Sequence, residues 1–164
     1  CDKALGGILF IDEAYNLCTD NDNYGQEALD TLMKRMEDDR GKFVVIASGY
    51  KDNMDAFMSV TPGLSSRFTH GMHIDDYNED ELLSIFKKMA SKDEYVLSQA
   101  AELKLMDAIC RLVVSKDSQF GNAREMRNML DKIIQHLSYR VSKMQPSEIT
   151  EDVFKVIMPE DIYN

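Results

Sequence analysis

Two adjacent carboxylates, Asp12 and Glu13, directly follow a run of large apolar residues. The run spans 8–11 and consists of Ile, Leu, Phe and Ile, which predicts a strand buried on both faces, as in a parallel sheet. Open α/β sheets bind ligands at the carboxyl ends of their strands. There, Asp12 is suited to hold Mg²⁺ through its water shell, and Glu13 is suited to orient or deprotonate an attacking water. The pair predicts nucleotide hydrolysis; the simpler alternative is a strand that ends in two solvated acids.

The residues after the carboxylates predict a helix and a second strand. Apolar residues recur at helical spacing from Ala28 to Met36, and Gly41 is a suitable place for the helix to stop. The run 43–47, Phe-Val-Val-Ile-Ala, predicts another fully buried strand rich in β-branched residues. A strand, a helix and a strand within about 40 residues predict a parallel crossover unit.

Shorter elements are expected before the character of the chain changes. We expect a short helix at 53–57, a break at 61–63 where Pro and Gly occur, and a short strand near 72–74. The boundary between two domains is expected near 75–77. The predicted domains are therefore 1–76, part of an α/β subdomain, and 77–164, a small helical subdomain.

The second domain is predicted to be all-helical. Asn78 with Glu81 three residues later is typical of a capping box at a helix start. A second helix is expected at about 98–116, and a third opens at Gly121-Asn122 with an apolar stripe that continues to Leu137. A last short helix is expected at 151–157.

Composition narrows the function classes. The 164 residues are 44% hydrophobic, enough for a core, and three scattered cysteines are typical of free thiols in a reducing compartment. The net charge of −10 argues against nucleic-acid binding, which needs a basic face. No apolar run approaches the roughly 20 residues that span a bilayer. We therefore expect a cytoplasmic protein that binds neither membranes nor nucleic acid.

The phosphate-binding loop that usually accompanies such a carboxylate pair is missing. This loop has the pattern G-x-x-x-x-G-K-[ST]. The only Gly-Lys pair is Gly41-Lys42, which precedes Phe43 and has Met36 in place of the first glycine. We therefore expect the sequence to be the carboxyl-terminal part of a nucleotide-binding domain whose amino-terminal half has been removed.

Five motifs occur in order along the chain: G-G-I-L-F-I-D-E-A-Y (6–15), E-A-L-D-T-L-M-K-R-M-E-D (27–38), V-V-I-A-S-G-Y (44–50), P-G-L-S-S-R-F (62–68) and F-G-N-A-R-E-M-R-N (120–128). Together they resemble the AAA+ ATPases, most closely the CbxX/CfxQ branch with red-type rubisco activase and the stage V sporulation protein K group. The resemblance covers most of 5–130 and implies ring-shaped hexamers that use ATP hydrolysis to remodel a protein client.

The resemblance implies roles for individual residues. Asp12 and Glu13 match the Walker B pair, with Asp12 on the magnesium ion. Arg67 matches the arginine finger that reaches the γ-phosphate bound by a neighbouring subunit. Ser48 and Tyr50 lie near the sensor-1 position, but neither is the common Asn. ATP and Mg²⁺ are therefore the expected cofactors, and a second copy of the chain is the expected partner.

Arg124 matches the sensor-2 arginine at the start of a lid helix. Both Arg124 and Arg127 lie in the first turns of the third predicted helix of the second domain, where a cation opposes the helix dipole. This placement suggests an anionic ligand such as a phosphate, for Arg124 rather than for Arg127. The alternative is an ion pair with Glu125 or Asp131.

Simpler interpretations remain for the other candidates. Arg67 could be a surface arginine paired with nearby acids. His70 and His73 lack a third ligand at metal-site spacing, and the acidic segment 20–22 lacks the full pattern of a calcium loop.

Two functions follow from these observations. The first is a subunit of an ATP-hydrolysing remodelling ring. The second is a non-catalytic assembly module that supplies the lid and the arginine finger but does not turn over ATP.

Overall fold

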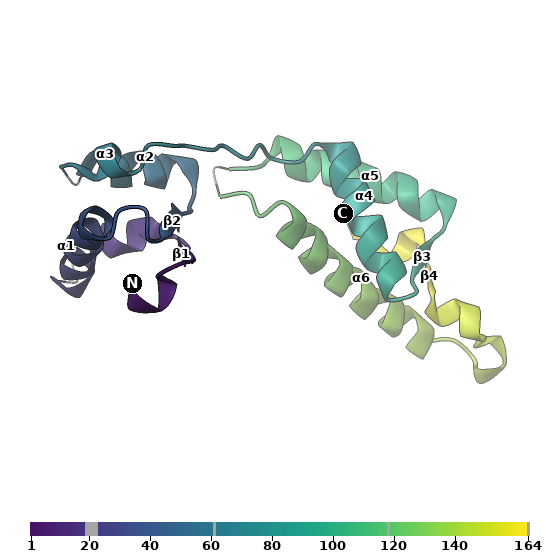
Figure 1. Ribbon diagram of the computed structural model, residues 1–164. Coiled ribbons are helices and arrows are strands. Elements are labelled where there is room, and N and C mark those ends of the chain that lie inside the picture. Colours follow the sequence, from purple (N-terminus) through teal and green to yellow (C-terminus); the bar gives the residue numbers. More distant parts are fainter. Residues whose placement is uncertain (19–22, 61, 118, 164) are drawn as a thin grey trace. The chain divides into compact units, whose positions relative to one another are not determined.

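The computed structural model describes residues 1–164 except 19–22, 61, 118 and 164. The acidic segment 20–22 thus lies outside the described residues. The chain forms two compact units, Cys1–Ile74 and Asp75–Asn164 (Figure 1).

The first unit is built around two parallel strands. Strands β1 (Ile8–Ile11) and β2 (Val44–Ala47) pair in parallel, with Ile8 opposite Val44 and Ile11 opposite Ala47. Helix α1 (Asn23–Asp38) connects them, so the predicted crossover is confirmed (Figure 1). The remaining elements of the unit are η1 (Asp2–Ala4), η2 (Ala14–Cys18), α2 (Lys51–Val60) and α3 (Leu64–Arg67).

The prediction that both strands are buried on both faces is wrong. Ile8 is 62% exposed, Phe10 59%, Val44 56% and Ile46 43%. Successive side chains of a strand point to opposite faces, and only the other face packs against the core of this unit. The packed face consists of Leu9, Ile11, Val45 and Ala47, against a core of Ala14, Leu29, Leu32, Phe57 and Leu64.

The strand expected near 72–74 is also absent. Residues 68–78 form neither helix nor strand, and Met72 and Ile74 are 90% and 83% exposed. A strand needs a partner for its backbone N–H and C=O groups, and no described strand pairs with this segment. The helix expected at 53–57 exists but extends over all of α2.

Three helices dominate the second unit: α4 (Glu79–Lys92), α5 (Gln99–Val114) and α6 (Ala123–Ser142). The capping box at the start of α4 is confirmed. The side chain of Asn78 accepts the N–H of Glu81 at 2.9 Å, and the Glu81 carboxylate accepts the N–H of Asn78 at 2.9 Å. The shared core holds Leu82, Phe86, Ala90, Ala101, Leu105, Ile109, Met126, Leu130, Ile133, Leu137, Val141, Ile157 and Ile162.

The second unit is not all-helical, contrary to the prediction. Strand β3 (Val96–Leu97) pairs in parallel with β4 (Val156–Ile157). In place of the helix expected at 151–157 there is a short 3₁₀ helix, η4 (Glu151–Phe154), followed by β4. Strands β3 and β4 are about 60 positions apart in the sequence. Pairing over such a separation cannot be predicted from local periodicity. The other short elements are η3 (Pro146–Glu148) and η5 (Pro159–Asp161).

Within the described part of the chain, no helix combines the length and the apolar character that crossing a bilayer requires.

Candidate functional site

Asp12 lies at the carboxyl end of β1, where Ser48 reaches it from the end of β2. The parallel pairing continues past both strands, because Ser48 N–H donates to the Ile11 carbonyl at 2.9 Å and Ala14 N–H donates to the Ser48 carbonyl at 3.0 Å. The Ser48 hydroxyl then donates to Asp12 Oδ1 at 2.7 Å. The structure thus brings together two residues that are 36 positions apart.

Glu13 occupies an unusual backbone conformation. Its φ is 49°, in the left-handed region that non-glycine residues rarely adopt. The N–H of Glu13 donates to Asp12 Oδ1 at 3.1 Å, and its Oε2 accepts the Asn16 side-chain amide at 3.1 Å. Both carboxylates are exposed, so water and a ligand can reach them. No pattern in the sequence predicted a role for Asn16.

Tyr50 has a different place from Ser48. Its carbonyl accepts the N–H of Met54 at 2.9 Å at the start of α2, and among the described residues no hydrogen bond joins its side chain to Asp12. Gly49 lies between Ser48 and Tyr50 in the sequence. A Cβ at position 49 would come within 2.7 Å of the Tyr15 ring and 2.9 Å of the Met54 sulfur. This close packing holds the segment after β2 beside the end of β1.

Arg67 lies at the end of α3 and folds back onto α1. Its Nε donates to the Met33 carbonyl at 3.2 Å and one terminal nitrogen donates to the Gly63 carbonyl at 3.1 Å. The other terminal nitrogen is 3.8 Å from the Glu37 carboxylate. The ion pair is long and Glu37 is 62% exposed, so its energetic contribution is small. In this conformation the guanidinium faces α1 of its own chain.

Arg124 and Arg127 belong to the second unit, in the first turns of α6. Both side chains are exposed. Among the described residues, neither forms a hydrogen bond or an ion pair, and the alternative pairing with Glu125 or Asp131 does not occur. The positive charges at this helix start are therefore available to an anion.

The fit to Mg²⁺ rests on a single carboxylate. The magnesium ion commonly keeps several waters and binds through one or two carboxylates plus substrate phosphates. Asp12 uses Oδ1 for the Ser48 hydroxyl and the Glu13 N–H, which leaves Oδ2 for such a water. The described residues contain no group of three or more His, Cys, Asp or Glu side chains placed for a metal ion, and His70 instead contacts Thr69 at 2.9 Å.

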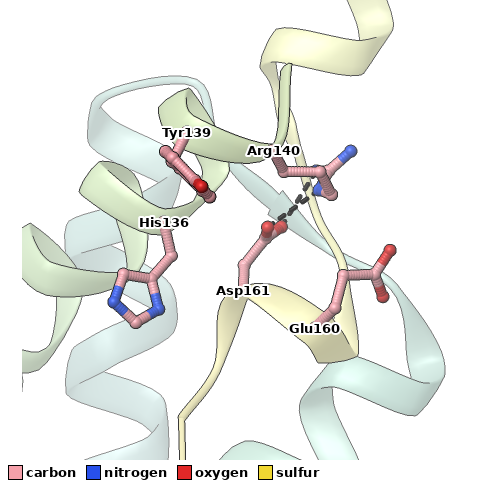
Figure 2. Close-up of a pocket in the computed structure, with 5 residues that line it drawn as sticks. All are labelled: His136, Tyr139, Arg140, Glu160 and Asp161. Carbon is pink, nitrogen blue, oxygen red and sulfur yellow. Dashed lines mark hydrogen bonds and ion pairs between the residues drawn. The ribbon is translucent and has the colours of Figure 1, made fainter. Parts of the chain in front are cut away.

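A hollow of about 480 Å³ lies elsewhere in the second unit, between α6 and η5. Arg140 and Asp161 both line it, and Figure 2 shows them in direct contact, joined by hydrogen bonds of 2.8 and 2.9 Å. The hydrogen bonds to Asp161, which is 1% exposed, raise the pKa of the Arg140 guanidinium above its ordinary value. Asp161 also accepts the N–H of Met158 at 2.9 Å. These contacts fasten the carboxyl-terminal segment to α6, which is a structural role.

Comparison with known proteins places this site in a family. Residues 2–76 match the ATPase family associated with various cellular activities, abbreviated AAA, and residues 78–164 match the AAA lid domain. The chain therefore belongs to the AAA ATPases, and its fold is part of an AAA α/β domain followed by a helical lid.

Individual relatives indicate which branch of the AAA ATPases this chain is similar to. Stage V sporulation protein K of Bacillus subtilis is 43% identical over 85% of this chain and 44% of its own length. Protein CfxQ of Xanthobacter flavus is 41% identical over 85% of this chain and 44% of its own length. The chloroplastic ribulose bisphosphate carboxylase/oxygenase activase of Cyanidioschyzon merolae is 38% identical over 98% of this chain and 55% of its own length. The chain spans about half the length of these relatives.

Proposed function

We propose that the full-length protein hydrolyses ATP with Mg²⁺ and uses the reaction to remodel a protein client in the cytoplasm, as a subunit of a ring of identical chains. The observation that carries the proposal is the contact between Ser48 and Asp12 beside Glu13 at the carboxyl edge of a parallel sheet. Ligands of open α/β sheets bind at this edge. Family membership supports the same chemistry.

Each residue at this edge has a distinct role in the proposal. Asp12 holds the water shell of Mg²⁺, and the Ser48 hydroxyl fixes the orientation of the Asp12 carboxylate. Glu13 orients or deprotonates the water that attacks the γ-phosphate. Bound ATP and Mg²⁺ supply the phosphoryl group and the charge that stabilises the leaving oxygen. Tyr50 lies two residues after Ser48, directly before α2, and is assigned an outer contact with the nucleotide.

Arginines complete the proposed site from other parts of the assembly. Arg124, and less directly Arg127, offer their unpaired charges to nucleotide phosphate from the lid. Arg67 acts as the finger on the nucleotide of a neighbouring subunit, for which it must leave its contacts with Met33 and Gly63. The relatives carry names from sporulation and from rubisco activation, so the proposal concerns the ATP-driven step rather than one client.

A second candidate is a non-catalytic assembly module. It is favoured by Arg67 and Arg124, whose contacts could serve assembly without ATP turnover. Such a module would support assembly without turnover.

The Glu13→Gln variant of the full-length protein tests the proposal. Glutamine keeps the size of the side chain and can still hydrogen-bond Asn16, but it cannot accept a proton. We expect ATP hydrolysis to fall by roughly 10²–10⁴, while ATP binding, measured with a fluorescent analogue, stays within about twofold. The matched control is Glu27→Gln, an exposed glutamate on α1, which should hydrolyse ATP normally. Unchanged hydrolysis in Glu13→Gln would overturn the role of this edge, and no hydrolysis in the unmodified protein would favour the assembly module.

A further inference from the structure

Asn122 adopts a backbone conformation that normally requires glycine. Its φ is 50° and its ψ is −116°, and the N–H of Arg124 donates to the Gly121 carbonyl at 2.9 Å. These are the angles of the first central residue of a type II′ turn, a position dominated by glycine, asparagine and aspartate. A residue with a side chain persists in such a sparsely populated conformation only when surrounding contacts hold it. The contacts of Asn122 should therefore explain its presence.

The Asn122 side chain joins segments that are far apart along the chain. Its Oδ1 accepts the backbone N–H of Tyr77 at 3.0 Å. Its Nδ2 donates to Asp76 Oδ1 at 2.8 Å, and also to the Phe120 carbonyl at 3.3 Å. The Lys116 ammonium pairs with the other carboxylate oxygen of Asp76 at 2.9 Å. We name the set Asp76, Tyr77, Lys116 and Asn122 the Asn122 clasp.

The Asn122 clasp joins the segment that precedes α4 to the turn that precedes α6. Asp76 and Tyr77 lie at the start of the second unit, immediately before the Asn78 cap of α4. Asn122 is the residue before α6, and Arg124 is the second residue of that helix. The place where the chain enters the lid is thus fastened to the turn that presents Arg124. A glycine at 122 would suit the backbone but could form none of the side-chain bonds.

We propose that Asn122 is a positioning residue for Arg124, and that the clasp couples nucleotide contact at Arg124 to the segment by which the chain enters the lid. The proposal rests on the proposed function, in which Arg124 contacts a nucleotide phosphate. The side-chain amide suits the task because one group must accept a backbone N–H and donate to a carboxylate at once. Arg124 and the entry segment then move as one piece.

The first test measures the clasp itself, by hydrogen exchange of the Tyr77 amide in the full-length protein. Asn122→Gly removes the side chain but suits the turn, so it separates the clasp from backbone strain. Loss of one hydrogen bond should speed exchange at Tyr77 by roughly tenfold. The amide of Glu102, which donates to the Ser98 carbonyl in α5, should be unaffected. Unchanged exchange at Tyr77 would overturn the clasp.

The second test exchanges the two polar partners and measures kcat and KM for ATP. Asn122→Asp alone places a carboxylate against Asp76 and should raise KM by about tenfold, a size typical of a broken charge-assisted hydrogen bond. The double variant Asp76→Asn with Asn122→Asp restores a donor and an acceptor with reversed roles, so most of the affinity should return. If Asn122 had only a structural role, Asn122→Asp would lower stability. KM would then neither rise in the single variant nor return in the double variant.

Two reference variants separate failure of this inference from failure of the proposed function. If Arg124→Ala leaves KM unchanged and Glu13→Gln leaves kcat unchanged, the proposed function fails and the inference fails with it. If both reference variants are impaired but Asn122→Gly and Asn122→Asp retain normal KM, the coupling alone is overturned. Impaired reference variants together with recovery in the double variant support the coupling.

Discussion

Backbone strain and candidate chemistry coincide at two residues. The described residues include three non-glycine positions with positive φ, Glu13, Glu94 and Asn122. Two of them carry or adjoin side chains of the proposed site, in keeping with the tendency of costly conformations to cluster at functional sites. At Glu13 the left-handed conformation turns the chain out of β1 into η2, where Asn16 reaches the carboxylate.

Arg67 provides a prediction that separates its two interpretations. If it is a finger, Arg67→Ala in the full-length protein should lower ATP hydrolysis by roughly 10³–10⁵, because the guanidinium neutralises charge on the transferred phosphoryl group. Binding of ATP should remain, and Arg67→Lys should rescue poorly because an ammonium lacks the planar fork. Steady-state hydrolysis and nucleotide binding are the measurements.

The control for this prediction is Arg40→Ala, which removes an exposed arginine of the same unit. It should hydrolyse ATP at the normal rate. If Arg67→Ala also hydrolyses ATP normally but unfolds more easily, its bonds to Met33 and Gly63 are the whole of its role.

Some of these residues could be predicted from the sequence and others could not, for a physical reason. Asp12 and Glu13 stand out because two acids directly follow an apolar run, whereas Ser48 was predicted only because the family resemblance places a sensor residue near it. Asn16 and Asn122 act through hydrogen bonds to neighbours, and the sequence shows neither the bond nor the positive φ. For Asn122, the Gly-Asn pair before a helix was visible as a helix start, but its bond to Tyr77 spans 45 positions.

Elements defined by local signals were predicted well. The capping box of Asn78 and Glu81 uses residues three positions apart, and the start of α4 was therefore predicted correctly. The exposure of one face of β1 and β2 was not predicted. An apolar run indicates that a strand can be buried, but it does not show what covers each face of the strand. The pairing of β3 with β4 depends on contacts across about 60 positions, beyond any local pattern.

Helix α5 offers a direct test of the packing in the lid. Leu105 is 0% exposed and Leu103 on the same helix is 71% exposed. Leu105→Ala should lower the free energy of unfolding by about 2–5 kcal/mol, because it removes buried methyl groups and leaves a cavity. Leu103→Ala should change it by less than about 0.5 kcal/mol. Urea unfolding followed by circular dichroism measures both.

Both variants replace a leucine by alanine on the same helix. The change in helix propensity is therefore matched, and the two differ in the burial of the leucine that is replaced. Equal losses of stability would contradict the assigned face of α5. A loss at Leu103 alone would mean that the helix is rotated from the orientation described.

At the scale of the whole molecule, the proposed site is divided between separate parts. Asp12, Glu13, Ser48 and Arg67 belong to one unit, and Arg124 belongs to the other. Arg67 bonds to carbonyls of its own unit in this structure, so the finger function requires a different conformation in an assembly. In the proposed function, Glu13 and Arg67 act on the same nucleotide from different copies of the chain.

ATP hydrolysis by mixtures of two inactive full-length variants tests whether Glu13 and Arg67 act across a subunit boundary. Rings of Glu13→Gln alone lack the base, and rings of Arg67→Ala alone lack the finger. Mixed rings contain interfaces where an intact Glu13 meets an intact Arg67, so partial hydrolysis should return and should peak at intermediate ratios. Mixtures that stay inactive at every ratio, although the subunits demonstrably assemble together, would contradict the claim.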